Sequence, residues 1–144
     1  GAVADFNKAL ELETDSRKKS NIAYKVATVF RRSSKSTARR YAQKAIDANP
    51  SNGKAYLLIA NLYATSANAC GETPFEKRVI YLRAAEMARR AGRVDPSLSG
   101  RANQSAASYS AKAPSKTDIF NSGLAGKTIA FKCWVGGSVK VPNL

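Results

Sequence analysis

The sequence contains no histidine, only two cysteines and only ten acidic residues among its 144 residues. Without histidine the chain lacks the commonest general base and the commonest metal ligand, which excludes Ser–His and Cys–His catalytic arrangements. Two cysteines are too few for a structural zinc site, which needs four ligands drawn mainly from Cys and His. We therefore expect a protein that is not an enzyme and that has no metal site and no cofactor.

Long apolar runs are also missing. No stretch approaches the roughly 20 apolar residues that a membrane span requires, so we expect no transmembrane segment. The first six residues, GAVADF, lack the basic start and the apolar stretch of a signal peptide. With 24 Lys and Arg residues the formal net charge is +14, which indicates either an anionic partner or a surface charge that only keeps the protein in solution.

Alanine is abundant, with 25 of the 144 residues, and it favours closely packed helices. A shift of the sequence by 46 places superimposes many small and aromatic residues, which indicates a helical repeat. The superimposed pairs are Ala38 and Ala84, Ala42 and Ala88, Ala45 and Ala91, Pro50 and Pro96, Ser51 and Ser97, Ala60 and Ala106, and Tyr63 and Tyr109.

The repeat resembles the tetratricopeptide repeat (TPR), a pair of antiparallel helices called A and B. The helix A positions are occupied by Ala23, Val26, Ala27 and Phe30, by Tyr56, Ile59, Ala60 and Tyr63, and by Ala102, Ser105, Ala106 and Tyr109. The helix B positions are occupied by Ala38, Ala42, Ala45 and Pro50, and by Ala84, Ala88, Ala91 and Pro96. The small residues at Ala27, Ala60 and Ala106 are expected to let helix A approach helix B closely.

Two departures from a regular array are predicted. Ala2, Phe6 and Ala9 have the helix B spacing with no helix A before them, so we expect the chain to be the C-terminal part of a longer array. The unit that ends at Pro96 is longer than the usual length of about 34 residues. Its excess lies at residues 64–75, where both flanking helices are expected to be longer and the turn around Cys70–Pro74 to project from one edge.

The composition changes after Pro114, where helical periodicity stops. From Lys127 to Val135, apolar and other side chains alternate as they do in a strand. Gly136-Gly137 then predicts a two-residue turn into Ser138–Val141. We expect a β-hairpin that lies against the last helix and caps the solenoid. The predicted fold is therefore an all-α, TPR-like solenoid over residues 1–112, with a small C-terminal β-hairpin cap over residues 113–144.

The combination of a solenoid and a C-terminal hairpin resembles a group of TPR proteins from Bacteroidetes. The resemblance rests on residues 66–71, residues 114–120 and the pair Cys133-Trp134. It implies a bacterial protein of the periplasm or cell envelope, with the cytoplasm as the alternative.

The two cysteines allow two interpretations. A Cys70–Cys133 disulfide would tie the hairpin to the second repeat, whereas unpaired thiols are normal in a reducing cytosol.

A further motif, Gly126-Lys127-Thr128, matches the end of a phosphate-binding loop. Because its first glycine is replaced by Asn121 and a strand follows, we interpret it as a turn that enters a strand.

The TPR resemblance also implies a partner-binding groove, lined by helix A side chains that are not used for packing. The site residues implied in this way are Tyr24, Lys25, Thr28, Arg31, Arg32, Lys54, Leu58, Asn61, Asn103 and Gln104, with Asn21, Leu57 and Ala107 beside them. The carboxylate clamp of chaperone-binding members is absent, because its positions are occupied by Tyr24, Thr28, Leu58, Gly100 and Gln104.

Two functions are compatible with these residues. The first is a non-enzymatic scaffold that presents a concave groove to a peptide or another protein. The alternative is binding to an anionic polymer such as nucleic acid through the basic clusters, although no separate nucleic-acid motif is present. These clusters are Arg17-Lys18-Lys19, Arg31-Arg32, Lys35, Arg39-Arg40, Lys77-Arg78 and Arg89-Arg90.

Overall fold

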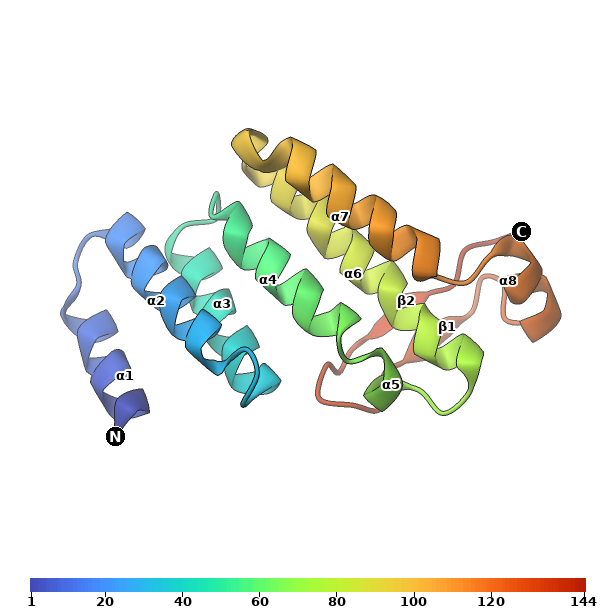
Figure 1. Cartoon of the computed structure of the whole chain (residues 1–144), viewed down its shortest axis with the longest axis horizontal. Helices are drawn as coiled ribbons and strands as arrows, with labels where there is room; N and C mark the ends of the chain where they lie inside the picture. Colours follow the sequence, from blue (N-terminus) through green and yellow to red (C-terminus); the bar gives the residue numbers. More distant parts are fainter.

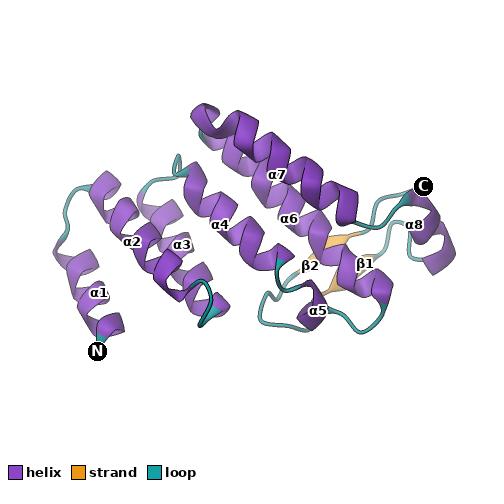
Figure 2. Cartoon of the chain, in the orientation of Figure 1, coloured by secondary structure: helices purple, strands orange, loops and turns teal.

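A computed structural model describes all 144 residues as a mostly helical chain with a small two-stranded antiparallel sheet near its C-terminus (Figures 1 and 2). The helices are α1 Ala2–Leu12, α2 Ser16–Phe30, α3 Lys35–Ala48, α4 Gly53–Ala64, α5 Ala67–Cys70, α6 Pro74–Val94, the 3-10 helix η1 Pro96–Leu98, α7 Ser99–Lys112 and α8 Lys116–Ser122. The strands are β1 Thr128–Ala130 and β2 Ser138–Lys140. None of the helices has the length and apolar character needed to cross a membrane.

The long helices succeed one another along a row from α1 at one end to α7 near the other, with α3 behind α2 and α6 behind α7 in the view of Figure 1. Helices that follow one another in the sequence pack together, with α2 against α3, α3 against α4, α4 against α6 and α6 against α7. Polar side chains define several helix starts, because Asp15, Ser34 and Asn52 each accept a hydrogen bond from the backbone N–H three residues later. The N-terminal boundaries of α2, α3 and α4 are therefore set locally by the sequence.

The alanines of the repeat pattern form the contact surfaces between the helices. The six alanines at the expected helix B positions are fully buried, namely Ala38, Ala42, Ala45, Ala84, Ala88 and Ala91. Ala27 and Ala60 on the preceding helices are fully buried as well, and Ala106 is 5% exposed. Because an alanine side chain adds little volume between two helix axes, the helices approach closely along these stripes. The burial of Ala27, Ala60 and Ala106 agrees with the expectation that small residues there allow close helix packing.

The residues inserted at 64–75 are distributed differently from the expectation. Helix α4 has 12 residues and is not lengthened, whereas α6 has 21. Between them, Ala67–Cys70 form the single turn α5. The start of α6 is set by a capping box, in which Thr73 accepts from the Glu76 backbone while the Glu76 carboxylate accepts from Thr73.

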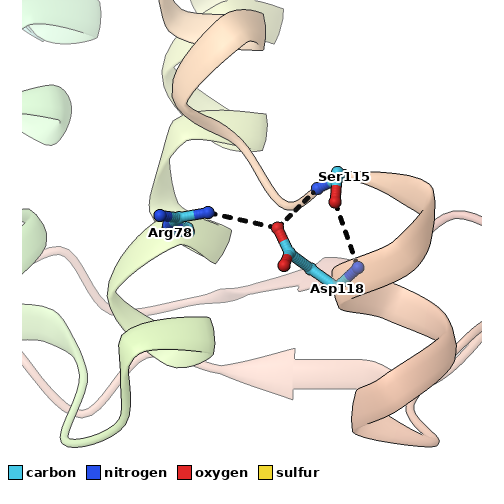
Figure 3. Close-up of polar contacts among 3 residues, drawn as sticks. All are labelled: Arg78, Ser115 and Asp118. Atoms are coloured by element: carbon cyan, nitrogen blue, oxygen red, sulfur yellow. Dashed lines mark hydrogen bonds and ion pairs between the residues drawn. The ribbon is translucent and has the colours of Figure 1, made fainter.

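The expectation that helical structure ends at Pro114 was wrong, because α8 follows at Lys116–Ser122. Ser115 and Asp118 form a capping box at its start, and the Asp118 carboxylate also pairs with Arg78 of α6 at 3.1 Å (Figure 3). A serine followed three residues later by a carboxylate is a recognisable helix start. The signal was present in the sequence but too short for periodicity to show it.

The predicted hairpin exists, but its two-residue turn does not. Each strand has three residues, paired in the register Thr128 to Lys140, and residues 131–137 form an irregular connection between them. Gly136 and Gly137 both have positive φ, and a Cβ on Gly137 would lie 2.5 Å from the Arg83 guanidinium. The connection is longer than predicted because its side chains enter the helical core and do not alternate across a sheet. The Gly126–Thr128 segment is a turn that enters β1, as predicted.

The hairpin also occupies a different place from the one expected. Strand β2 lies against α6, and Phe131 and Val135 are buried in the core cluster that α3, α4 and α6 share. Phe120, which belongs to the segment expected to cap the last helix, is 71% exposed. The last helix needs no such cover because its small buried side chains already pack on α4 and α6, in a cluster formed by Leu57, Ala60, Ala88, Ala91, Ala102 and Ala106.

Candidate functional site

A small pocket of about 150 Å³ lies between α2, α4 and α7, and we call it the groove. Its lining residues come from three helices, or the residue next to one, that are not consecutive in the sequence. They are Tyr24 of α2 and Arg31 directly after it, Lys54, Leu57, Leu58 and Asn61 of α4, and Arg101, Ser105 and Tyr109 of α7.

A hydrogen bond between two groove residues joins the first two helices. Arg31, the residue directly after α2, donates through Nη2 to Oδ1 of Asn61 on α4 at 2.7 Å. Close to this end of the groove, the Lys35 ammonium donates to the carbonyl oxygen of Thr65 at 2.9 Å. The first bond connects the turn after α2 to α4, and the second connects the start of α3 to the residue that follows α4, so both hold this end of the groove in place.

The groove is positively charged. Arg31, Lys54 and Arg101 contribute three cations, and no carboxylate is among the lining residues. Leu58 is 5% exposed and forms an apolar floor, while Tyr24 and Tyr109 are half-buried at the sides. This arrangement can hold a short segment that presents an acidic group together with an apolar or aromatic side chain.

The structure brings half of the expected groove residues together. Tyr24, Arg31, Lys54, Leu58 and Asn61 line the same pocket. The other five expected residues are exposed on α2, in the turn after it or on α7, and are not among its lining residues: Lys25, Thr28, Arg32, Asn103 and Gln104.

Helix α7 contributes residues that the family resemblance did not indicate. Arg101, Ser105 and Tyr109 are spaced by four residues and therefore lie on one face of the helix. Ala102 and Ala106 beside them are buried in the cluster that α4, α6 and α7 share, which turns the 101–105–109 stripe toward the groove. This spacing was visible in the sequence, but the facing helix could be identified only from the packing.

A second polar centre lies where the C-terminal segment meets the helices. A disulfide joins Cys70 of α5 to Cys133, across a sequence separation of 63, with the Cα atoms 4.9 Å apart. Next to it, the Trp134 indole N–H donates to Ser66 Oγ at 2.9 Å, and Ser66 in turn donates to the carbonyl oxygen of Leu62. These contacts attach the segment after β1 to α4 and α5.

Three carboxyl groups have a lowered pKa, and all three stand at helix N-termini outside the groove. Hydrogen bonds from backbone N–H groups are the main cause of each lowered pKa: from Lys18 for Asp15, from Glu72 and Thr73 for Glu76, and from Ser115 for Asp118. These groups act in helix capping, since a carboxylate at a helix N-terminus satisfies free N–H donors and complements the helix dipole.

Comparisons of the chain with protein-family models, with curated proteins and with solved structures found no match.

Proposed function

We propose that this chain is a non-enzymatic, TPR-like interaction scaffold whose groove holds an acidic peptide segment of another protein. The observation that carries the proposal is the convergence of Arg31, Lys54 and Arg101 in one pocket without a lining carboxylate. The internal 46-residue repeat and the row of packed helices support the TPR-like assignment (Figure 1).

The mechanism is presentation of a preformed surface. The groove walls are packed helices, and the Arg31–Asn61 hydrogen bond holds one guanidinium in position before a partner arrives. Binding therefore requires little ordering of the scaffold, which leaves more of the contact energy for affinity. The partner supplies carboxylates for the cations and an apolar side chain for Tyr24 and Tyr109.

The chain has no histidine and therefore no obvious base to activate a nucleophile. This composition supports a binding function over a catalytic one. The joined cysteines further favour an oxidising compartment, such as the bacterial periplasm, for the scaffold.

Selection from a phage-displayed random peptide library tests the proposal directly. We expect the purified chain to enrich peptides that share acidic residues. The double variant Lys54→Glu/Arg101→Glu should weaken their binding about tenfold or more, because each reversed charge repels the ligand carboxylates. Both side chains are exposed and make no hydrogen bond, so the variant should remain folded.

The matched control is Arg89→Glu/Arg93→Glu, which makes the same change of charge at exposed positions of α6 outside the groove. Peptide binding to the control should stay within about twofold of the wild-type affinity. The proposal fails if no peptide is enriched, or if the groove variant and the control weaken binding equally.

A further inference from the structure

A second positively charged pocket, which shares no residue with the groove, lies between α3, the end of α4 and α6. It is open, with a volume of about 620 Å³. Its lining includes four cations, Arg39, Arg40, Lys44 and Arg83, and one carboxylate, Asp47. We call it the four-cation pocket.

Two of these cations are held rigidly by the C-terminal segment. Arg39 donates to the carbonyl oxygens of Trp134 and Val135, and Arg83 donates to the carbonyl oxygen of Gly136 at 2.7 Å. Because the three acceptors belong to consecutive residues, the two guanidinium groups lie near one another. Each is half-buried and therefore cannot move freely.

Aromatic rings support all four cations. The Arg39 guanidinium lies 4.9 Å from the centre of the Trp134 ring, and Arg83 lies 5.1 Å from that of Tyr63. Arg40 and Lys44 lie over the ring of the buried Tyr41, at 5.5 and 5.1 Å. A cation over a ring keeps its outward N–H groups available for a ligand.

The charge of the pocket is not neutralised by the protein. The two ion pairs of the structure, Arg78–Asp118 and Arg90–Glu86, lie elsewhere. Asp47 accepts a hydrogen bond from Gln43 and pairs with none of the four cations. Four positive groups around one pocket repel one another, and an anion placed between them would relieve this repulsion.

We propose that the four-cation pocket binds a compact, multiply charged phosphate-type anion that is free in solution, such as pyrophosphate or a small phosphorylated compound. Guanidinium N–H groups match the oxygen acceptors of phosphate, and the carbonyl groups of Trp134, Val135 and Gly136 hold two guanidiniums in place while leaving each of them N–H donors without a partner. Several cations around one open pocket match a small ligand with more than one negative charge. The proposal is independent of the groove and of its peptide ligand.

The same contacts disfavour a nucleic acid as the ligand. Single-stranded nucleic acids gain affinity by stacking their bases on exposed aromatic rings. Here the rings of Tyr41, Tyr63 and Trp134 are covered by the cations or buried in the core. A phosphate group can reach the guanidinium N–H groups, but a base finds no open ring beside them.

Isothermal titration of the full chain with pyrophosphate, at low salt, tests the proposal. The test variant is Arg40→Gln/Lys44→Gln, because both side chains are exposed and make no hydrogen bond, so the fold and the two fixed guanidiniums stay in place. The matched control, Arg89→Gln/Arg93→Gln, removes two exposed charges from α6 outside the pocket. Circular dichroism checks that all three proteins have the same helix content.

We expect wild type and control to bind pyrophosphate with affinities within about twofold, and the pocket variant to bind about tenfold or more weakly, since each lost contact is a charged hydrogen bond. Absence of pyrophosphate binding to wild type, or equal weakening in the control, overturns the proposal. A single-stranded oligonucleotide provides the second arm. If it binds much more tightly than pyrophosphate and loses affinity in the pocket variant, the ligand is a polymer and the proposal is wrong.

Discussion

Reduction of the Cys70–Cys133 disulfide should lower the stability of the whole helical row. The bond closes a loop with a sequence separation of 63, and the loss of chain entropy in the unfolded state is then worth about 4 kcal/mol at 25 °C. A domain of this size is stable by about 5–15 kcal/mol, so the reduced protein should remain folded but much less stable. At about 2–4 °C per kcal/mol, the melting temperature should fall by roughly 8–16 °C.

Urea unfolding of the oxidised and the reduced protein measures the effect. Trp134 is the only tryptophan, and it lies next to Cys133, so its fluorescence reports on the attachment of the C-terminal segment. Circular dichroism follows the helices separately. With a urea slope of about 2 kcal/mol per M, the midpoint should shift by about 2 M on reduction.

The double variant Cys70→Ala/Cys133→Ala provides the control. It should unfold at the midpoint of the reduced wild-type protein, and reductant should leave it unchanged because it has no bond to break. If oxidised and reduced wild-type protein unfold at the same urea concentration, the C-terminal segment does not constrain the helices. The entropy argument would then be refuted.

Three further predictions concern packing, the indole contact and pH. Ala88→Leu should destabilise the fold by about 1–3 kcal/mol, because Ala88 is fully buried and no room remains between α6 and α7 for a larger side chain. The control Ala107→Leu, at an exposed position of α7, should change the urea midpoint very little. Trp134→Phe removes the hydrogen bond to Ser66 and should lower the free energy of unfolding by about 0.5–1.5 kcal/mol or more. Urea unfolding is followed by circular dichroism because the variant contains no tryptophan. An unchanged urea midpoint would contradict the contact. The capping carboxylates Asp15, Glu76 and Asp118 have a pKa below the ordinary values of 3.8 for Asp and 4.5 for Glu. Their stabilising effect is therefore complete above about pH 4.5 and is lost as the pH falls through the lowered pKa values. Melting temperatures measured from pH 7 to pH 2 should fall mainly below about pH 4.5, and a fall confined to higher pH would contradict this assignment.

The site could be predicted only in part. Tyr24, Lys54 and Asn61 were placed in a groove by their repeat positions, and they do line one pocket. Arg101 and Tyr109 were not assigned to it, because a helical stripe shows which residues share a face but not which neighbour that face meets. The four-cation pocket was beyond sequence reasoning altogether. Of its basic residues, only Arg39 and Arg40 belonged to a basic cluster seen in the sequence, and the carbonyl groups that hold Arg39 lie 95 and 96 residues further along the chain.

The sequence by itself determined the main helices and their buried faces. Alanines at helical spacing and capping residues such as Asp15 and Thr73 act within a few residues of the chain, so their effects can be recognised before any packing is known. The tertiary structure alone decided where residues 131–137 go. Three-residue strands contribute little stability of their own, and Phe131, Val135 and Trp134 gain more by packing against α3, α4 and α6 than by extending the hairpin. Burial among distant helices therefore outweighed the local alternation that had predicted a long, regular hairpin.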